Sequence, residues 1–309
     1  MDKIIVSGNK GFVGKNLVPY LLENSFQITG VSRSPKSTKE VSYKSLSVEN
    51  WNNSLAIVHL AGKAHDLKNV ADDSEYFNVN TELTKKLFNQ FLKSKCKVFI
   101  YMSSVKAVAD VVDGVLKEDE IPNPVTIYGK SKLAAEAYLL NQILPKDKKV
   151  YILRPCMIHG PGNKGNLNLL YKLVQKGIPY PLGAFDNKRS FLSIENLCFV
   201  IHQFLIKRPQ SGIFNVADDT PISTNMLIEV IATVFGEKSK VLNVPKILVN
   251  ACAKIGSLCK LSFNEERLQK LTENYVVSNL KIKQVLNIKL PISTVTGLSV
   301  TIKSFRDEL

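Results

Sequence analysis

The chain has 309 residues, of which 45% are hydrophobic, and this length and composition fit one large or two modest globular domains. No apolar run reaches the roughly 20 residues that cross a bilayer, and the five cysteines lack the spacing of a metal site, so we expect a reduced, cytoplasmic protein without a transmembrane segment or a bound metal. The formal net charge of +14 would suit binding to nucleic acid or to an anionic membrane surface. However, the lysines are scattered and form no cluster with aromatic residues, so we expect only a basic surface and no nucleic-acid partner. An anionic substrate would also benefit from this charge.

The chain opens with a predicted strand, a glycine-rich turn and a predicted helix. Residues 4–6 are β-branched, and apolar residues at helical spacing occupy 17–22. Between them Gly8, Gly11 and Gly14 stand three residues apart. Glycines at such a junction let the backbone approach a pyrophosphate, whose charge then faces the helix N-terminus. The stretch predicts a dinucleotide site, and an ordinary tight turn is the alternative.

Strands and helices alternate through the first half of the chain. We expect strands at 26–32, 56–62, 97–104 and 149–155, and helices at 76–94 and 127–144. This alternation predicts an α/β fold with a doubly wound parallel sheet. Beyond about residue 155 the chain is rich in Gly and Pro and has shorter helices, such as 194–205. We therefore expect a dinucleotide-binding domain at 1–155 and a smaller substrate-binding lobe at 156–309, with some segments returning to the sheet.

Candidate catalytic groups follow the glycine-rich turn. Ser103 and Ser104 end a predicted strand, where doubly wound sheets place their ligands. Tyr128 and Lys132 lie four residues apart, on one face of a predicted helix. A nearby ammonium brings the tyrosine pKa down from ~10, so that the phenol can exchange a proton with an oxygen held by a serine. A strand-end cap and a chance Tyr-x-x-x-Lys are the structural alternatives, but the order of these groups favours catalysis.

These stretches resemble the extended short-chain dehydrogenase/reductase family, in particular its NAD-dependent epimerase/dehydratase branch. The resemblance covers almost the whole chain and lies in GNKGFVG, HLAG, FNVNTELTKKL, YMSSVK, YGKSKLAAEAYL, LRPCMIHGPGNKGN, PYPLG and NKRSFLSIENL. Within the branch the chain is most similar to bacterial polysaccharide-biosynthesis members that are UDP-glucose 4-epimerases or reductases of UDP-4-keto-6-deoxy sugars. The resemblance implies a Rossmann fold, a UDP-sugar substrate and a homodimer built on the helices at 78–94 and 127–144.

The resemblance also implies which residues bind the cofactor and carry the reaction. Tyr128 would be the catalytic acid/base, Lys132 would bind the nicotinamide ribose and lower the tyrosine pKa, and Ser104 would orient the substrate. The cofactor-binding residues would be Gly8, Gly11, Phe12, Val13, Gly14, Leu60, Ala61, Gly62, Lys63, Tyr128, Lys132 and Pro155.

The substrate side is implied by the second half of the chain. Asn166 and Leu167 match the turn that binds uridine diphosphate in the family. Arg189 matches the arginine that grips the diphosphate, a task that suits a guanidinium fork. The resemblance does not specify the sugar, or whether it is N-acetylated.

The chain departs from the 4,6-dehydratases of this branch beside the predicted catalytic serine. Those enzymes carry an Asp-Glu pair immediately after the serine or threonine, whereas Val105 and Lys106 stand here. Neither carboxylate needed for the elimination is present, which argues against a dehydratase. The usual aromatic-glycine pair is replaced by Val108 and Ala109, so the resemblance does not define the sugar pocket.

The second departure is at the end of the second predicted strand. Members specific for NAD place an acidic residue there, which accepts both ribose hydroxyls. This chain carries Ser32 and Arg33, with Lys36 nearby, and these cations could meet a 2′-phosphate. We expect NADP(H), with NAD(H) as the alternative if Arg33 only stacks on the adenine.

Three functions remain open. The favoured one is reduction of a UDP-4-keto-6-deoxyhexose at C4, because a reductase consumes NADPH. The second is a UDP-hexose 4-epimerase, for UDP-glucose or UDP-GlcNAc, which would keep NAD bound through each cycle. The third is a non-catalytic dinucleotide-binding sensor or scaffold, which would not need the proton donor Tyr128.

Overall fold

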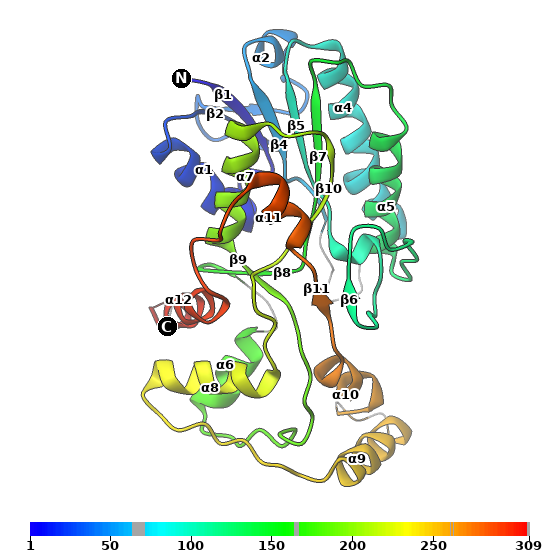
Figure 1. Cartoon of the computed structure of the whole chain (residues 1–309), viewed down its shortest axis with the longest axis vertical. Coiled ribbons are helices and arrows are strands. Elements are labelled where there is room, and N and C mark those ends of the chain that lie inside the picture. The colour runs from blue at the N-terminus through cyan, green and yellow to red at the C-terminus, as the bar shows by residue number, and fades with distance from the viewer. Residues whose placement is uncertain (64–71, 164–166, 260, 262, 308–309) are drawn as a thin grey trace.

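The computed structural model describes residues 1–63, 72–163, 167–259, 261 and 263–307. At its centre lies a seven-stranded sheet in the order β10-β7-β5-β4-β1-β2-β3, with each neighbouring pair parallel (Figure 1). Its strands are β1 (Lys3–Ser7), β2 (Gln27–Ser32), β3 (Glu40–Ser42), β4 (Ala56–His59), β5 (Val98–Met102), β7 (Lys149–Pro155) and β10 (Gly212–Val216).

Helices cover both faces of the sheet. One face packs against α1 (Phe12–Glu23), α7 (Ile194–Lys207) and α11 (Leu280–Leu286), and the other against α2 (Val48–Asn52), α4 (Leu83–Lys93) and α5 (Ile127–Leu140). All residues of β4 and β5 are buried, as expected for central strands enclosed on both faces. The predicted doubly wound parallel sheet is confirmed.

A smaller lobe lies beyond the carboxyl ends of the strands, at the lower end of Figure 1. It contains α6 (Leu167–Gln175), α8 (Thr224–Phe235), α9 (Lys246–Leu258) and α10 (Glu265–Thr272). Helix α12 (Thr294–Asp307) packs into the hydrophobic core of this lobe. Two short parallel pairs connect it to the sheet: β8 (Met157–His159) with β9 (Phe191–Ser193), and β6 (Val115–Leu116) with β11 (Val276–Val277). The division of the chain at residue 155 stays a prediction.

The helix predicted at 76–94 runs over residues 73–93 and contains one π-helical turn. It consists of α3 (Asp73–Phe77), one π-helical turn η1 (Asn78–Glu82) and α4. In the π turn the Asn80 carbonyl accepts a hydrogen bond of 2.7 Å from the Thr84 hydroxyl. Such turns interrupt α-helices and are frequent at functional sites. The helix predicted at 127–144 ends at Leu140, a few residues before Pro145, which disfavours helical backbone just ahead of it.

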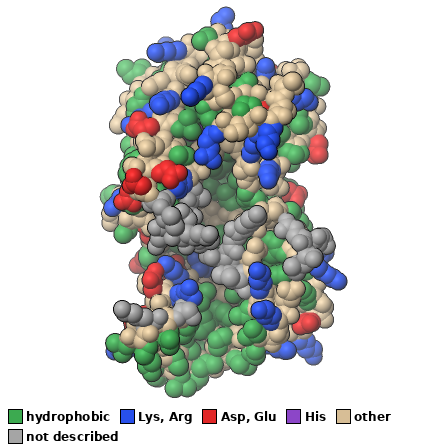
Figure 2. Space-filling view, turned by 180° about the vertical axis from the view of Figure 1, so that it is seen from behind, with side chains coloured by type: hydrophobic (Ala, Val, Ile, Leu, Met, Phe, Trp, Pro, Cys, Tyr) green, Lys and Arg blue, Asp and Glu red, His purple; other side chains and the backbone are tan. Residues whose placement is uncertain are grey.

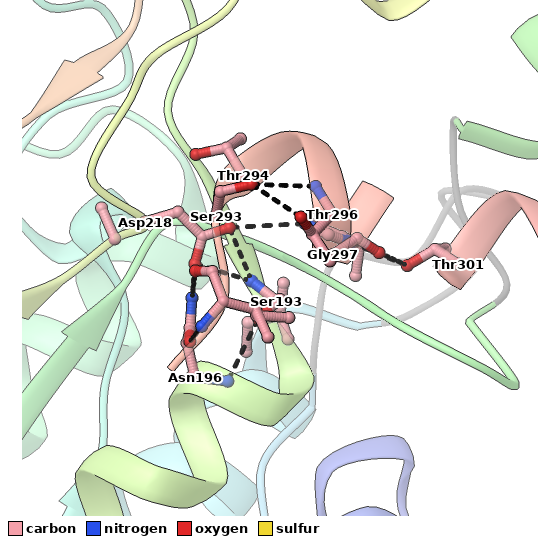
Figure 3. Close-up of polar contacts among 12 residues, drawn as sticks. Ser193, Asn196, Asp218, Ser293, Thr294, Thr296, Gly297 and Thr301 are labelled. Atoms are coloured by element: carbon pink, nitrogen blue, oxygen red, sulfur yellow. Dashed lines mark hydrogen bonds and ion pairs between the residues drawn. The ribbon is translucent and has the colours of Figure 1, made fainter. Parts of the chain in front are cut away.

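A buried polar network fastens α12 to the start of α7 (Figure 3). The Asp218 carboxylate accepts hydrogen bonds from the Ser193 amide at 3.1 Å and from Asn196 Nδ2 at 2.7 Å. On α12, the Thr294 hydroxyl donates to the Thr220 carbonyl at 2.9 Å. These contacts join the sheet-covering helix α7 to the last helix of the chain.

Candidate active site

The glycine-rich turn lies against the end of β4. Gly8 has φ +74°, and a Cβ on it would stand 2.7 Å from the Ala61 nitrogen. A Cβ on Gly14 would stand 2.5 Å from the Gly8 carbonyl oxygen. Since real Cβ atoms do not approach backbone so closely, these two positions need glycine. The turn therefore brings bare backbone to the carboxyl edge of the sheet.

This turn leads directly into the N-terminus of α1, which has no side-chain cap among the described residues. Gly11 is the N-cap, and Phe12 and Val13 form the first turn. The unpaired amides and the positive end of the helix dipole suit an anion. A cradle of bare backbone at an uncapped helix N-terminus fits the diphosphate of a dinucleotide.

The predicted catalytic serine and tyrosine lie close together. Ser104 follows β5 and caps the short 3-10 helix η2 (Val105–Ala107), where its hydroxyl accepts from the Lys106 amide at 3.2 Å. Tyr128 lies in the first turn of α5, near the Ser104 side chain. Burial raises the pKa of Tyr128, and the Ser104 contact only partly offsets the rise.

Lys132 lies one turn further along α5 and is 4% exposed. Its ammonium donates to the Met102 carbonyl at 2.8 Å, and burial lowers the Lys132 pKa to about 8 despite the opposing charge of Glu136. The Tyr128 pKa is raised rather than lowered as expected from a neighbouring ammonium, and burial of the phenol is the largest cause. The raised pKa keeps Tyr128 protonated near neutral pH, the form that a proton donor needs.

A buried ion pair supports the catalytic helix. Arg154, at the end of β7, meets Glu136 of α5 with 2.6 Å between Nη2 and Oε2. The Ser103 hydroxyl donates to the same carboxylate. Both charged side chains are almost fully buried, so Arg154 does not reach a ligand site and instead ties α5 to the sheet. Arg154 lies in the strand predicted at 149–155, but nothing in the sequence indicated that it would pair with Glu136.

The sequence analysis missed Asn80, which organises the space beside Lys132. Asn80 lies in the π turn, fully buried, where its Oδ1 accepts from the Lys63 amide at 2.8 Å and its Nδ2 donates to Ser131 Oγ at 2.9 Å. A Cβ on Gly62 would lie 2.9 Å from Lys132 Nζ and 3.0 Å from Asn80 Oδ1. A buried asparagine in an amphipathic helix was the signal that could have been followed.

The other predicted cofactor residues lie along the same edge. Leu60 and Ala61 directly follow β4, and Pro155 ends β7. The Lys63 side chain turns away to an ion pair with Glu75 at 2.5 Å. Among the residues that the structure describes, no group of three or more His, Cys, Asp or Glu side chains could hold a metal ion.

The end of β2 carries the predicted cofactor-selecting pair. Ser32 is buried, and its hydroxyl has no hydrogen-bond partner among the described residues. The neighbouring Arg33 is exposed. An unpaired hydroxyl next to an exposed guanidinium can donate to a phosphate group on an adenosine ribose.

A carboxylate that the sequence analysis missed lies beside the glycine-rich turn. Glu40, on β3, accepts from the Lys36 amide at 2.6 Å and from Asn9 Nδ2 at 2.9 Å, and Lys10 Nζ lies 3.0 Å away. The Lys36 amide and then the Lys10 ammonium hold the pKa of the Glu40 carboxyl below its usual range. Its two oxygens are therefore already engaged by the protein. No sequence pattern indicated that β3 would bring Glu40 here.

The structure describes two of the three residues predicted to bind only the substrate. Asn166 lies outside the described residues, whereas Leu167 begins α6 and is buried. The Arg189 guanidinium donates to the Lys270 carbonyl at the end of α10 at 2.8 Å, and lies 3.8 Å from Glu273. Arg189 is thus braced by the lobe, with about a quarter of its side chain exposed.

Lys106 follows the predicted catalytic serine, and the charge of Arg189 acts on its ammonium. Its ammonium donates to the Asp110 carbonyl at 2.8 Å and sits 4.4 Å from the centre of the Tyr275 ring. Burial lowers the Lys106 pKa; the carboxylates of Asp110 and Glu273 oppose this effect, and the charge of Arg189 adds to it. The sequence identified Lys106 only as the replacement for a dehydratase carboxylate, and the structure adds its contacts with the Asp110 carbonyl and the Tyr275 ring.

Comparison with known proteins agrees with this geometry. The model of the NAD dependent epimerase/dehydratase family matches residues 4–217. The chain is 32% identical over 322 residues to a UDP-glucose 4-epimerase of Vibrio cholerae, covering 98% of this chain and 95% of the relative. It is 26% identical to the GDP-6-deoxy-D-mannose reductase of Pseudomonas aeruginosa, covering 75% of this chain and 80% of the relative.

Among solved structures, the UDP-N-acetylglucosamine 4-epimerase of Bacillus cereus has the same fold. Its TM-score is 0.77 at 22% identity, covering 99% of this chain and 100% of that one. The relatives thus include both epimerases and reductases of nucleotide sugars.

Proposed function

Because the chain belongs to the NAD-dependent epimerase/dehydratase family, we propose that it is an oxidoreductase acting at C4 of a UDP-sugar, and that it reduces a UDP-4-keto-6-deoxyhexose for a surface polysaccharide. The observation that carries the proposal is the position of the Tyr128 phenol near Ser104 at the carboxyl edge of the sheet, one helical turn from Lys132. A hydroxyl, a phenol and an ammonium converge there beside a dinucleotide cradle.

The nicotinamide supplies the hydride when it is bound. As that hydride reaches C4 of the sugar, Tyr128 would give its phenolic proton to the C4 oxygen, and the ketone would become an alcohol. Ser104 would hold that oxygen in place, and Lys132 would leave the Met102 carbonyl to bind the ribose. Water would then restore the proton of Tyr128, so the reaction balances with one hydride and one proton per turnover.

Three features favour reduction with NADPH. Ser32 and Arg33 offer a free hydroxyl and an exposed cation where an NAD-specific member has a carboxylate. The nearby Glu40 carboxylate is engaged by Asn9, Lys10 and the Lys36 amide, and so is poorly placed to accept ribose hydroxyls. The raised pKa of Tyr128 also suits a group that begins the cycle protonated.

A UDP-hexose 4-epimerase is the second candidate. The 32% identity to the Vibrio cholerae epimerase over almost the full chain favours it, and the same three groups could act reversibly. A non-catalytic sensor or scaffold is the third candidate, which turnover of any nucleotide sugar would exclude. In each case the substrate diphosphate would meet Arg189, with Asn166 and Leu167 holding the uridine side.

The proposal also includes the expected cytoplasmic homodimer. The helices η1 and α4 (78–93) and α5 lie side by side on one face of the sheet, and Tyr138 of α5 donates to Asn89 of α4 at 2.7 Å. This paired surface would form half of a four-helix bundle. Sedimentation of the purified protein measures the oligomeric state.

The cofactor separates the two leading candidates. Parent, Arg33→Ala and Ser32→Asp proteins should each be titrated with NADPH and NADH by calorimetry. The parent should prefer NADPH by roughly ten- to a hundredfold, as expected for one charge-assisted contact of ~1.5–3 kcal/mol. Arg33→Ala should lose most of that preference with little effect on NADH, and Ser32→Asp should reverse it.

Lys44→Ala is the matched control, since it removes an exposed positive charge that lies beyond β3. Rising salt should erode the NADPH preference, because the contact lies at the surface. If the parent prefers NADH, or keeps NAD bound through purification, the reductase assignment fails and the epimerase takes its place.

A further inference from the structure

Helix α9 presents an apolar face to solvent. Ile247 and Leu258 are 83% and 80% exposed, and Leu248 and Ile255 are each more than half exposed. With Ala251 they recur at intervals of one, three and four residues, which places them on one side of a helix. We call these five residues the α9 outer face.

The buried side of α9 is a narrow strip of small residues. Its buried residues are Val249, Ala253 and Gly256, and a Cβ on Gly256 would come within 1.8 Å of the Phe263 carbonyl oxygen. The larger apolar side chains thus point away from the protein, the reverse of the usual amphipathic helix on a globular core. Apolar side chains gathered in this way mark an interaction surface.

The segment around this face is strongly basic. Between residues 238 and 260 the chain has five lysines and no Asp or Glu: Lys238, Lys240, Lys246, Lys254 and Lys260. Lys246 and Lys254 lie on α9 itself and are exposed, on the strip that adjoins the outer face. None of the lysines in the described part of this segment forms an ion pair with a described residue. Part of the +14 net charge is thus concentrated here.

The position of α9 leaves its outer face accessible. Figure 1 places α9 at the extreme lower end of the molecule, farthest from the sheet. Figure 2 shows hydrophobic side chains gathered at this end, with Lys and Arg side chains above them. No described helix is long and apolar enough to span a bilayer, and α9 itself has 13 residues. A helix of this kind can lie in the plane of an interface.

We propose that the α9 outer face docks the protein onto an anionic lipid bilayer. Ile247, Leu248, Ile255 and Leu258 would enter the boundary between headgroups and acyl chains, while Lys246 and Lys254 would meet lipid phosphates. A second copy of the chain fits less well, because a symmetric contact through this face would bring the two sets of lysines together without any carboxylate from the segment.

Sedimentation with vesicles tests the docking. The parent protein should bind vesicles of phosphatidylcholine that contain phosphatidylglycerol, bind little to phosphatidylcholine alone, and release as salt rises. The double variant Ile247→Ser/Leu258→Ser should bind at least ~10-fold more weakly, because two large apolar side chains no longer leave water. Lys246→Glu/Lys254→Glu should remove the preference for phosphatidylglycerol.

Ile143→Ser is the matched control. Ile143 is 95% exposed and follows α5 before β7, at the opposite end of the sheet from the lobe. It should bind vesicles as the parent does. Parent protein that ignores anionic vesicles, or α9 variants that bind them as well as the parent, would overturn the proposal. An α9 variant that changes the sedimentation mass would instead identify the face as a contact between copies, and would overturn it too.

The exposed thiol Cys252 locates the contact independently. Cys252 and Cys259 are exposed on α9, whereas the remaining three cysteines are buried. A polarity-sensitive dye on Cys252 of a Cys259→Ser protein should shift to shorter wavelength with phosphatidylglycerol vesicles, and a spectrum that does not move would contradict contact through α9. Because α9 supplies no residue of the candidate active site, turnover of a soluble UDP-sugar should be the same in parent and α9 variants, so the two proposals fail separately.

Discussion

Two regions of the molecule place their apolar side chains in opposite ways. At the carboxyl edge of the sheet, β4 and β5 are buried at every residue, and Tyr128 and Lys132 stand on a helix packed against them. At the far end of the lobe, α9 buries a valine, an alanine and a glycine and exposes its isoleucines. The enclosed edge of the sheet can hold a few polar atoms in fixed geometry, whereas α9 offers an exposed apolar surface.

This difference indicates how each end should respond to substitution. At the enclosed edge, polar groups depend on one another, so that one change should affect chemistry or stability strongly. In the lobe, Arg189 and the α9 face should affect binding more than folding. The predictions below test that contrast, from the largest expected effect to the smallest.

Tyr128→Phe removes only the phenolic oxygen. We expect turnover to fall by at least ~10²-fold, the range of general acid-base catalysis, with cofactor affinity nearly intact. Steady-state kinetics and a cofactor titration measure the two effects. Tyr138→Phe, on the same helix but bonded to Asn89, is the control and should turn over normally. Normal turnover by Tyr128→Phe would refute the assigned proton donor.

The Arg154→Leu protein should unfold at a lower urea concentration than the parent protein. It leaves the Glu136 carboxylate buried without its guanidinium, and breaking such a pair costs about 3–5 kcal/mol. Urea denaturation measures the loss. The double variant Glu136→Met/Arg154→Leu should recover most of it, because neither charge of this pair is then left buried without its partner. A single variant as stable as the parent would show that this pair does not support the enclosed edge.

Arg189→Ala should weaken UDP-sugar binding and leave cofactor binding alone. Loss of a charge-assisted contact to the diphosphate predicts about 1.5–3 kcal/mol, or roughly one to two decades in affinity. Calorimetry with UDP measures it, and Arg189→Lys should keep part of the affinity. Equal affinity of variant and parent would leave Arg189 only its structural bond to the Lys270 carbonyl.

Cofactor affinity should depend on pH through Lys132. The buried ammonium has a pKa of about 8, so the charged form that would bind the ribose is present below that pH and is lost above it. One pH unit above the pKa, affinity should be roughly tenfold weaker. Lys132→Met should bind more weakly at all pH values and show no step near pH 8. A step that survives in this variant would belong to another group.

Much of the enclosed edge could be predicted from the sequence, because its signals are local. Three glycines at fixed spacing, runs of β-branched residues and two residues four apart on a helix each reflect backbone geometry. Strand 149–155 was predicted with the bounds that the structure gives. The π turn was not predicted, since nothing near Asn80 in the sequence distinguishes it from the helix on either side.

The rest of the site depends on contacts between distant segments. Glu40 reaches Asn9 and Lys10 only because β3 adds to the sheet edge beside β2. Burial raises the pKa of Tyr128, which is opposite to the direction expected from the sequence. Glu136 meets Arg154 across 18 residues, and the Lys132 ammonium donates to the Met102 carbonyl across 30 residues. Such pairings follow from tertiary packing and leave no periodic trace in the chain.

Hydride transfer to sugar C4 is the most direct test of the central claim. NADPH carrying deuterium at the transferable position of nicotinamide C4 should be mixed with a UDP-4-keto-6-deoxyhexose, and the product examined by NMR. We predict deuterium at C4 of the sugar with the parent protein and at least ~10²-fold slower labelling with Tyr128→Phe. An epimerised UDP-hexose without label, formed by protein that carries NAD, would favour the epimerase. No product from either class of substrate would contradict an oxidoreductase acting at C4.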